Sequence, residues 1–167
     1  MSDAARRRRR WSLFAGLAAG VLIADQLTKE WIRANVPPGQ PPVEVIGEYV
    51  RLIHTRNTGG IFGLFGESAL VLAMASTVVI ALIVVYQARD GARGPWLLAV
   101  ALGLLLGGAL GNFIDRLRFE HVTDFVDVGI GTLRWYTFNV ADAAISIAIV
   151  LFLGVAVLGD RLPERLR

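Results

Sequence analysis

The chain has 167 residues, and 54% of them are hydrophobic. A soluble domain of this size could not bury so much apolar surface in one core, so we expect a membrane protein. Cysteine is absent, which excludes a disulfide framework, a thiolate nucleophile and a zinc site built from cysteine. The net charge is +3, but the basic residues form short clusters beside apolar runs. This pattern indicates membrane orientation and not nucleic acid binding.

Four segments are long and apolar enough to cross a bilayer, which takes about 20 helical residues. They are residues 11–27, 68–87, 96–114 and 139–158. The arginine run at 6–10, followed by the first apolar segment, also resembles the start of a secretory signal peptide. Removing that segment would leave another multi-span protein, so a retained first helix is the simpler interpretation.

The segments between the predicted spans differ in their content of basic residues. Residues 1–10, 88–95 and 159–167 hold ten of the 17 Lys and Arg residues, and the longer loops 28–67 and 115–138 hold the other seven. Basic residues accumulate on the cytoplasmic side of a membrane protein. We therefore predict one all-α membrane domain over residues 1–167, with both termini cytoplasmic and with loops 28–67 and 115–138 extracytoplasmic.

The first extracytoplasmic loop is predicted to carry a small β-rich platform at the membrane surface. It opens with turn-forming residues at 37–42, and residues 43–55 are rich in β-branched and aromatic side chains. Trp135, Tyr136 and Phe138 precede the fourth span and suit an interfacial aromatic belt. The platform and the belt would thus lie at the same face of the membrane.

Glycines recur at intervals of four residues in two of the spans. Gly103, Gly107 and Gly111 follow this spacing in the third span, and Gly16 and Gly20 follow it in the first. Small residues at this spacing let two helix backbones approach closely in lipid. We predict that both sets form packing contacts and take no part in chemistry.

Three carboxylates are predicted to lie at one depth near the outer surface. At about 1.5 Å per residue, Asp25, Asp115 and Asp142 lie about 21, 28 and 24 Å from the cytoplasmic ends of their spans. An ionisable group within the membrane is costly and usually functional, and Asp142 has no charged neighbour in sequence. Asp25 fits equally well an ion pair with Lys29, four residues later. For Asp115 we favour an ion pair with Arg116 that closes the helix.

The sequence offers no evident general base to activate a serine nucleophile. The only lysine, Lys29, already has a nearby carboxylate, and neither His54 nor His121 lies near a serine in sequence. Ser68, at the outer end of the second span, remains a weak candidate.

A pair of aspartates offers another route to hydrolysis. Two close carboxylates share one proton, so one can activate water while the other protonates the developing oxyanion. The residues alone leave the partner of Asp142 open among Asp115, Asp124 and Asp127. Of these, Asp127 fits best as a solvated residue of a strand or turn, because charged and apolar residues alternate around it.

Two other functions would also use clustered aspartates. A metal-dependent transferase would want carboxylates on neighbouring helical turns, whereas here they are dispersed over separate elements. A small ion-coupled transporter could use Asp25 and Asp142 as a relay. Against it, the aspartates gather near one face instead of the midplane, and the two halves of the chain show no inverted repeat.

At these residues the chain resembles the lipoprotein signal peptidases, the aspartic membrane proteases also called signal peptidase II. Five segments carry the resemblance and occur in family order: 25–29, 57–63, 107–116, 122–125 and 138–142. They span most of the chain, and five such segments in order are a highly specific signal. One departure is Gly60 and Ile61, where the family commonly has two alanines.

The resemblance implies an activity and a set of site residues. The catalytic dyad would be Asp124 and Asp142, with no metal and no cofactor. The substrate would be a diacylglyceryl-modified prolipoprotein, cleaved on the amino side of its lipidated cysteine. We expect a monomer in contact with membrane lipid, in the bacterial cytoplasmic (inner) membrane, with its active site at the extracytoplasmic face. The residues implied to bind substrate or support the site are Asp25, Lys29, Asn57, Gly59, Asn112, Asp115, Arg116 and Asn139.

Overall fold

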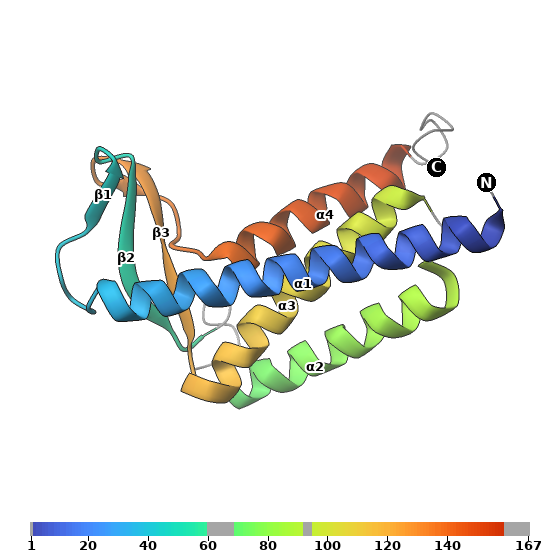
Figure 1. The fold of residues 1–167 in the computed structure, drawn as a ribbon. Helices are drawn as coiled ribbons and strands as arrows, with labels where there is room; N and C mark the ends of the chain where they lie inside the picture. The colour runs from blue at the N-terminus through green and yellow to red at the C-terminus, as the bar shows by residue number, and fades with distance from the viewer. Residues whose placement is uncertain (1, 60–68, 92–94, 159–167) are drawn as a thin grey trace.

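A computed structural model of the chain describes residues 2–59, 69–91 and 95–158. Within these residues, four helices are long and apolar enough to cross a membrane, and they run side by side (Figure 1). A small antiparallel sheet lies at one end of the helices. The helical membrane fold and the small sheet confirm those parts of the sequence-based prediction.

Helix α1 (Asp3–Asn35) is much longer than the apolar run inside it. Its 33 residues span about 50 Å, more than the hydrocarbon core of about 30 Å. The side chain of Ser2 caps its first turn, and it ends just before Pro37 and Pro38, which lack the N–H that a helix needs. The residues from 28 onward, which we had predicted to form a loop, therefore begin as two further helical turns.

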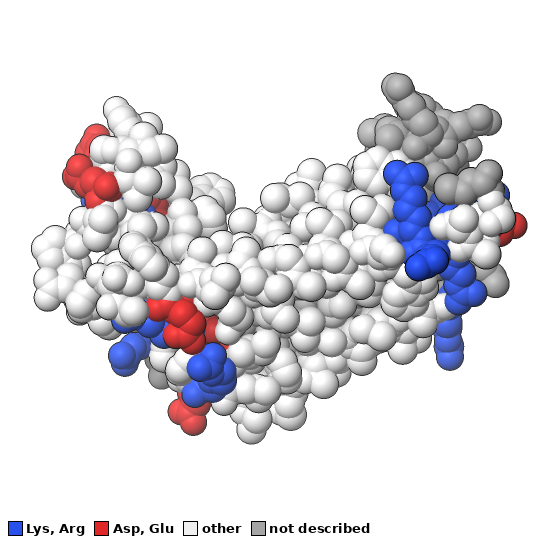
Figure 2. Space-filling model, viewed as in Figure 1, with Lys and Arg blue, Asp and Glu red and all other residues white. Residues whose placement is uncertain are grey.

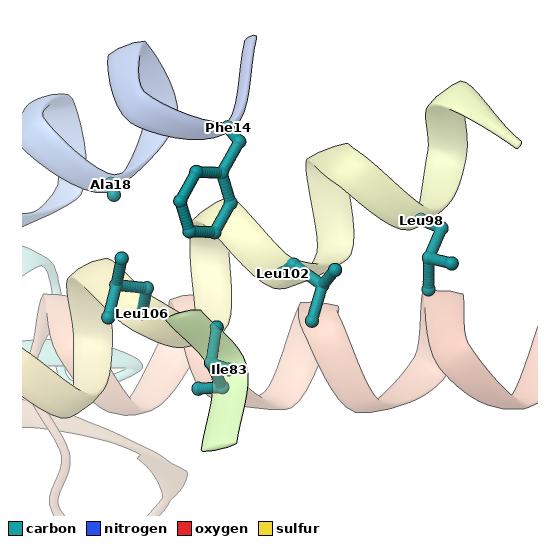
Figure 3. Packing of buried hydrophobic residues seen from close by; sticks show 6 residues of the cluster. All are labelled: Phe14, Ala18, Ile83, Leu98, Leu102 and Leu106. Atoms are coloured by element: carbon teal, nitrogen blue, oxygen red, sulfur yellow. The ribbon is translucent and has the colours of Figure 1, made fainter. Parts of the chain in front are cut away.

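Helix α3 (Trp96–Phe119) is the central element of the bundle. It packs against α1, against α2 (Ala69–Tyr86, continued by the π-helical turn η2, Gln87–Gly91) and against α4 (Val140–Leu158). Its most apolar stretch is 61% buried, compared with 11–17% in the other three helices. Figure 3 shows Phe14 of α1 and Ile83 of α2 packed against leucines of α3. The other helices thus present most of their apolar surface outward, as a lipid environment requires.

The glycines of α3 allow this close packing. A Cβ atom at Gly103 would lie 2.7 Å from the carbonyl oxygen of Phe14, and one at Gly107 would lie 2.6 Å from that of Ala18. The predicted packing contact is confirmed for α3. At Gly16 and Gly20 the described residues make no such contact within the bundle, since a Cβ atom at either position would meet nothing within 4 Å. The α3 glycines alone supply the close approach to α1.

The sheet draws its strands from both long loops. Its order is β1 (Val43–Ile46), β2 (Val50–Asn57), β3 (Val122–Ile130) and β4 (Leu133–Arg134), all antiparallel. We call these four strands the platform. The prediction placed a platform in the first loop alone, and it is incomplete because the second loop provides half of the strands.

The platform is anchored on the end of α1. Ile32 and Val36 form a buried cluster with Phe125 of β3. Helix α3 ends at Phe119 and is capped by Glu120, which adopts a left-handed conformation with φ of 62°, and the chain then turns directly into β3. This reversal brings the first residues of β3, including Asp124, over the end of the bundle.

Charged side chains gather at the two ends of the molecule, and the surface between them shows no Lys, Arg, Asp or Glu in this view (Figure 2). The end that carries the chain termini shows mostly Lys and Arg, whereas the platform end shows both signs of charge. Such a distribution suits a chain whose middle lies in lipid.

Candidate active site

Asp124 on β3 and Asp142 in the first turn of α4 are joined through one residue, Asn139. The side-chain nitrogen Nδ2 of Asn139 donates to Asp124 Oδ1 at 2.6 Å, and its backbone N–H donates to Asp142 Oδ2 at 3.2 Å. In return, the backbone N–H of Asp142 donates to Asn139 Oδ1 at 2.9 Å. This reciprocal arrangement is a capping box, which starts α4. The same residues thus begin the helix and fix one carboxylate beside the other.

Two further asparagines complete the hydrogen bonding of these carboxylates. Asn57 Nδ2 donates to Asp124 Oδ2 at 2.9 Å, and Asn112 Nδ2 donates to Asp142 Oδ1 at 2.8 Å. Each of the four carboxylate oxygens therefore accepts at least one hydrogen bond from β2, α3 or the cap of α4. Donors placed in this way restrict the rotation of both carboxylates and keep them in one geometry.

Burial makes Asp124 a weaker acid than an ordinary aspartate. Its side chain is almost completely buried. Removal from water and then the neighbouring Asp142 carboxylate raise the pKa of Asp124 to about 7, against the opposite effect of the Asn57 and Asn139 hydrogen bonds. A carboxyl with a pKa near neutral pH can both donate and accept a proton there. The pair therefore has the electrostatic character of an acid–base dyad.

A buried cluster of charges lies directly behind the two carboxylates. The Lys29 ammonium lies 2.8 Å from Asp25 Oδ2 and 3.1 Å from Asp115 Oδ2, and none of these three side chains is exposed. Asp25 Oδ1 also accepts the backbone N–H of Ala141 at 3.0 Å. Gly111 leaves the space for this carboxylate, since a Cβ atom there would collide with Asp25 Oδ2. Of the two interpretations of Asp25, the ion pair with Lys29 is confirmed.

The predicted ion pair between Asp115 and Arg116 is wrong. Asp115 accepts from Lys29 and from the backbone N–H of Thr123. Consecutive residues of a helix point about 100° apart, so Arg116 faces elsewhere. Arg116 interacts electrostatically with Asp142 and Asp124 first and with Asp115 only after them, and its Nη1 donates to the Asn112 carbonyl at 3.4 Å.

Asp127 is also placed differently from our expectation of a solvated residue. Only 4% of it is exposed. Arg51 Nη2 and Arg134 Nη2 approach its Oδ2 at 2.6 and 2.8 Å, and the hydrogen bonds from Arg134 and then Arg51 lower the pKa of Asp127. The antiparallel register, which pairs Arg51 with Asp127, causes this burial. Asp127 fastens three strands of the platform together and takes no part in the dyad.

Gly59, the remaining predicted site residue, is the last residue of the described segment 2–59. Gly59 forms a bend two residues after β2. The segment that continues from it, with Gly60 and Ile61, lies outside the described residues, as does Ser68.

Sequence reasoning missed three side chains that contact the site. Gln26 Nε2 donates to Asp25, Asp115 and the Gly111 carbonyl, each at 3.2 Å. The Thr123 hydroxyl accepts from Arg33 at 2.8 Å, and the Tyr136 hydroxyl accepts from Asn57 at 2.9 Å. Gln26 and Thr123 are adjacent in sequence to the predicted site residues Asp25 and Asp124, and this adjacency could have identified them. For Tyr136, the only signal in the sequence was its position in a cluster of aromatic residues.

Comparisons with known proteins agree on one family. The pattern of the Peptidase A8 family, described as Signal peptidase (SPase) II, matches residues 17–158. The chain is 41% identical to the Lipoprotein signal peptidase of Moorella thermoacetica over 138 residues, which cover 83% of this chain and 88% of that protein. It is 38% identical to the Lipoprotein signal peptidase of Oleidesulfovibrio alaskensis, over 78% of this chain and 85% of that protein.

Two solved structures, each described as a bacterial membrane enzyme, share the fold. One matches with a TM-score of 0.76 at 29% identity, over 90% of both chains. The other matches with a TM-score of 0.75 at 32% identity, over 86% of this chain and 91% of that one.

Proposed function

Because the chain belongs to the signal peptidase II family, we propose that it removes the signal peptide from diacylglyceryl-modified prolipoproteins, cutting on the amino side of the lipidated cysteine. The chain is a multi-pass membrane aspartic protease of bacterial type. The pair of Asp124 and Asp142 supports this activity, because their four carboxylate oxygens all accept hydrogen bonds from neighbouring residues.

The two aspartates cleave the peptide bond by acid–base catalysis. The pair holds one proton, since two close carboxylates resist ionising together. The ionised member takes a proton from water as the water oxygen attacks the scissile carbonyl, and the protonated member donates to the developing oxyanion. Collapse of the tetrahedral intermediate then expels the cysteine amine with a proton. Arg116 places a positive charge near the pair, which favours the negative charge of this intermediate.

The site lies on the extracytoplasmic face of the inner membrane. Asp142 lies in the first turn of α4, at the platform end of the bundle. The arginine run at 6–10 lies near the start of α1, at the opposite end (Figure 1), which the distribution of basic residues assigns to the cytoplasm. A lipid-bearing substrate can approach laterally, with its acyl chains along the outward apolar faces of the helices. The platform then holds the peptide near the dyad.

The chain works as a monomer. Gly103 and Gly107 already pack against α1 within the bundle, so these positions are not available to a second chain. Light scattering of the purified protein in detergent, corrected for bound detergent, measures the oligomeric state.

Substitution of each aspartate tests the dyad. Asp124→Asn and Asp142→Asn should fold and bind detergent as the wild type does, yet should not cleave a diacylated prolipoprotein. Asp3→Asn is the matched control, because it makes the same change at an exposed position in the first turn of α1, at the other end of the bundle, and should cleave at the wild-type rate. Retained cleavage by either aspartate variant would contradict the dyad.

The mechanism requires neither a metal nor a covalent intermediate. Turnover should persist in excess chelator. Hydrolysis in isotopically labelled water should place a single solvent oxygen in the new carboxyl group, with no acyl-enzyme trapped. The transporter alternative is not favoured, since the family of the chain is a peptidase family.

A further inference from the structure

Lys29 occupies the centre of the buried charge cluster and uses all of its donors. The ammonium lies 2.8 Å from Asp25 Oδ2, 3.1 Å from Asp115 Oδ2 and 2.9 Å from Asn112 Oδ1. An ammonium group has three N–H donors, so each is taken by one of these acceptors. Lys29 therefore has no N–H left to donate to Asp124 or Asp142, and its hydrogen bonds reach the dyad only through its neighbours.

The bond to Asn112 determines how this asparagine faces Asp142. The Asn112 amide has an accepting oxygen at one side and a donating nitrogen at the other. An ammonium can only donate, so the amide oxygen must face Lys29. The amide nitrogen is thereby left for Asp142 Oδ1, to which it donates at 2.8 Å. If the amide turned over, its oxygen would face the carboxylate oxygen, and the two would repel each other.

The same amide oxygen also supports Asp124. Asn112 Oδ1 accepts from Asn139 Nδ2 at 3.2 Å, and Asn139 Nδ2 donates in turn to Asp124 Oδ1. The orientation set by Lys29 therefore reaches both members of the dyad, Asp142 through one hydrogen bond and Asp124 through a second asparagine.

The charge of Lys29 matters as well as its hydrogen bonds. The charged and titratable groups around the dyad are Asp25, Lys29 and Arg33 of α1, Asp115 and Arg116 of α3, and Tyr136, which follows β4. Lys29 and Arg33 together balance the two supporting carboxylates, Asp25 and Asp115. Removal of the ammonium would leave one uncompensated negative charge beside the dyad and would make the dyad hold its proton more strongly.

We infer that Lys29 is a positioning residue for the cleavage reaction: it fixes the amide of Asn112 toward Asp142, and its charge sets the pH range in which the dyad loses its proton. This inference rests on the proposed function and extends it to a residue that touches neither substrate nor the reacting atoms.

Three variants separate the two effects. Lys29→Met removes the donor and leaves an unbalanced negative charge. Lys29→Met with Asp115→Asn removes the same donor but restores the charge balance. Asp115→Asn alone keeps the donor and leaves an excess positive charge. Arg118→Met is the control, because Arg118 is exposed and pairs only with Glu30 among the charged groups described.

We expect kcat to fall about 100-fold in both Lys29 variants with little change in KM, since a misplaced catalytic group costs about this much. The alkaline limb of the pH profile should move to higher pH in Lys29→Met, stay in place in the double variant and move to lower pH in Asp115→Asn. The control should match the wild type in both respects. The double variant has no unbalanced charge to bury, so it keeps the test available if Lys29→Met does not fold.

Two results would contradict the inferred role of Lys29. A folded double variant with wild-type kcat would overturn the positioning role of Lys29. A pH profile that is identical in all variants would overturn the role of its charge, because a purely structural lysine would change only stability. Failure of the wild type to cleave a diacylated substrate is a different result, which would count against the proposed function itself.

Discussion

We expect Asp124 to determine the pH range in which this protein can cut. Its pKa is raised to about 7 by burial and by the neighbouring Asp142 carboxylate. A dyad that shares one proton works while it holds that proton and stops when its second carboxyl group ionises. We therefore expect kcat/KM for prolipoprotein cleavage to fall as the pH rises through about 7. Initial rates measured across this range provide the test, and a rate that keeps rising well above neutral pH would contradict a shared proton.

Asp127 should affect stability instead of catalysis. Its carboxylate accepts charged hydrogen bonds from Arg51 and Arg134, so Asp127→Asn should lower the free energy of unfolding by about 2 kcal/mol. The pKa of Asp127 is lowered in the folded protein, mainly by Arg134. Its stabilising effect is therefore complete above the ordinary carboxyl pKa of about 3.9 and is lost as the pH falls below that value.

Thermal unfolding of both proteins as a function of pH measures this effect. The difference in Tm between wild type and Asp127→Asn should be constant near neutral pH and should shrink below about pH 4. A difference that grows with acid would mean that the carboxylate is not stabilised by the two arginines. At neutral pH the folded variant should still cleave prolipoprotein.

At the scale of single residues, the sequence identifies isolated charges better than it identifies their partners. Asp142 was evident because it interrupts an apolar helix. Asp124 could not be separated from Asp115 and Asp127 by the residues alone, because all three fall within one predicted loop and their environments depend on distant partners. The partner of Asp115 is Lys29, on another helix, and adjacency in sequence suggested the wrong one.

At the scale of elements, the α3 glycines should be far less tolerant than those of α1. Gly107→Val would force a side chain to within 2.6 Å of the Ala18 carbonyl oxygen, and overpacking of this kind costs about 1–3 kcal/mol. Gly20→Val is the matched control, because a Cβ atom there meets nothing within 4 Å. We expect a lower Tm in detergent for the first variant only, and equal effects of the two would contradict the assigned contact.

The extents of the elements depend on contacts that the sequence does not display. Apolar run length indicates where a helix crosses lipid, because the bilayer sets that length. The last two turns of α1 are polar and nevertheless helical, since Lys29 and Ile32 are buried against the rest of the molecule. Strand β3 pairs with β2, from another loop, so its place in the platform follows from the approach of α1 and α3.

At the scale of the whole molecule, the two ends differ in charge and in architecture. One end carries the arginine run at 6–10, and the other carries the platform and the two aspartates. This asymmetry orients the protein if basic residues remain on the cytoplasmic side. A substrate that is lipidated outside the cytoplasm could reach the dyad only in this orientation, so topology and activity must agree.

The absence of cysteine makes this orientation directly measurable. We expect a membrane-impermeant maleimide to label Glu48→Cys in spheroplasts, because Glu48 is exposed in the turn between β1 and β2. Arg7→Cys, exposed at the opposite end, should react only after the membrane is permeabilised. Both variants should retain prolipoprotein cleavage, which shows that the labelled molecules are correctly folded. Labelling in the reverse pattern would place Asp124 and Asp142 on the cytoplasmic side, where a lipidated precursor that has crossed the membrane could not reach them.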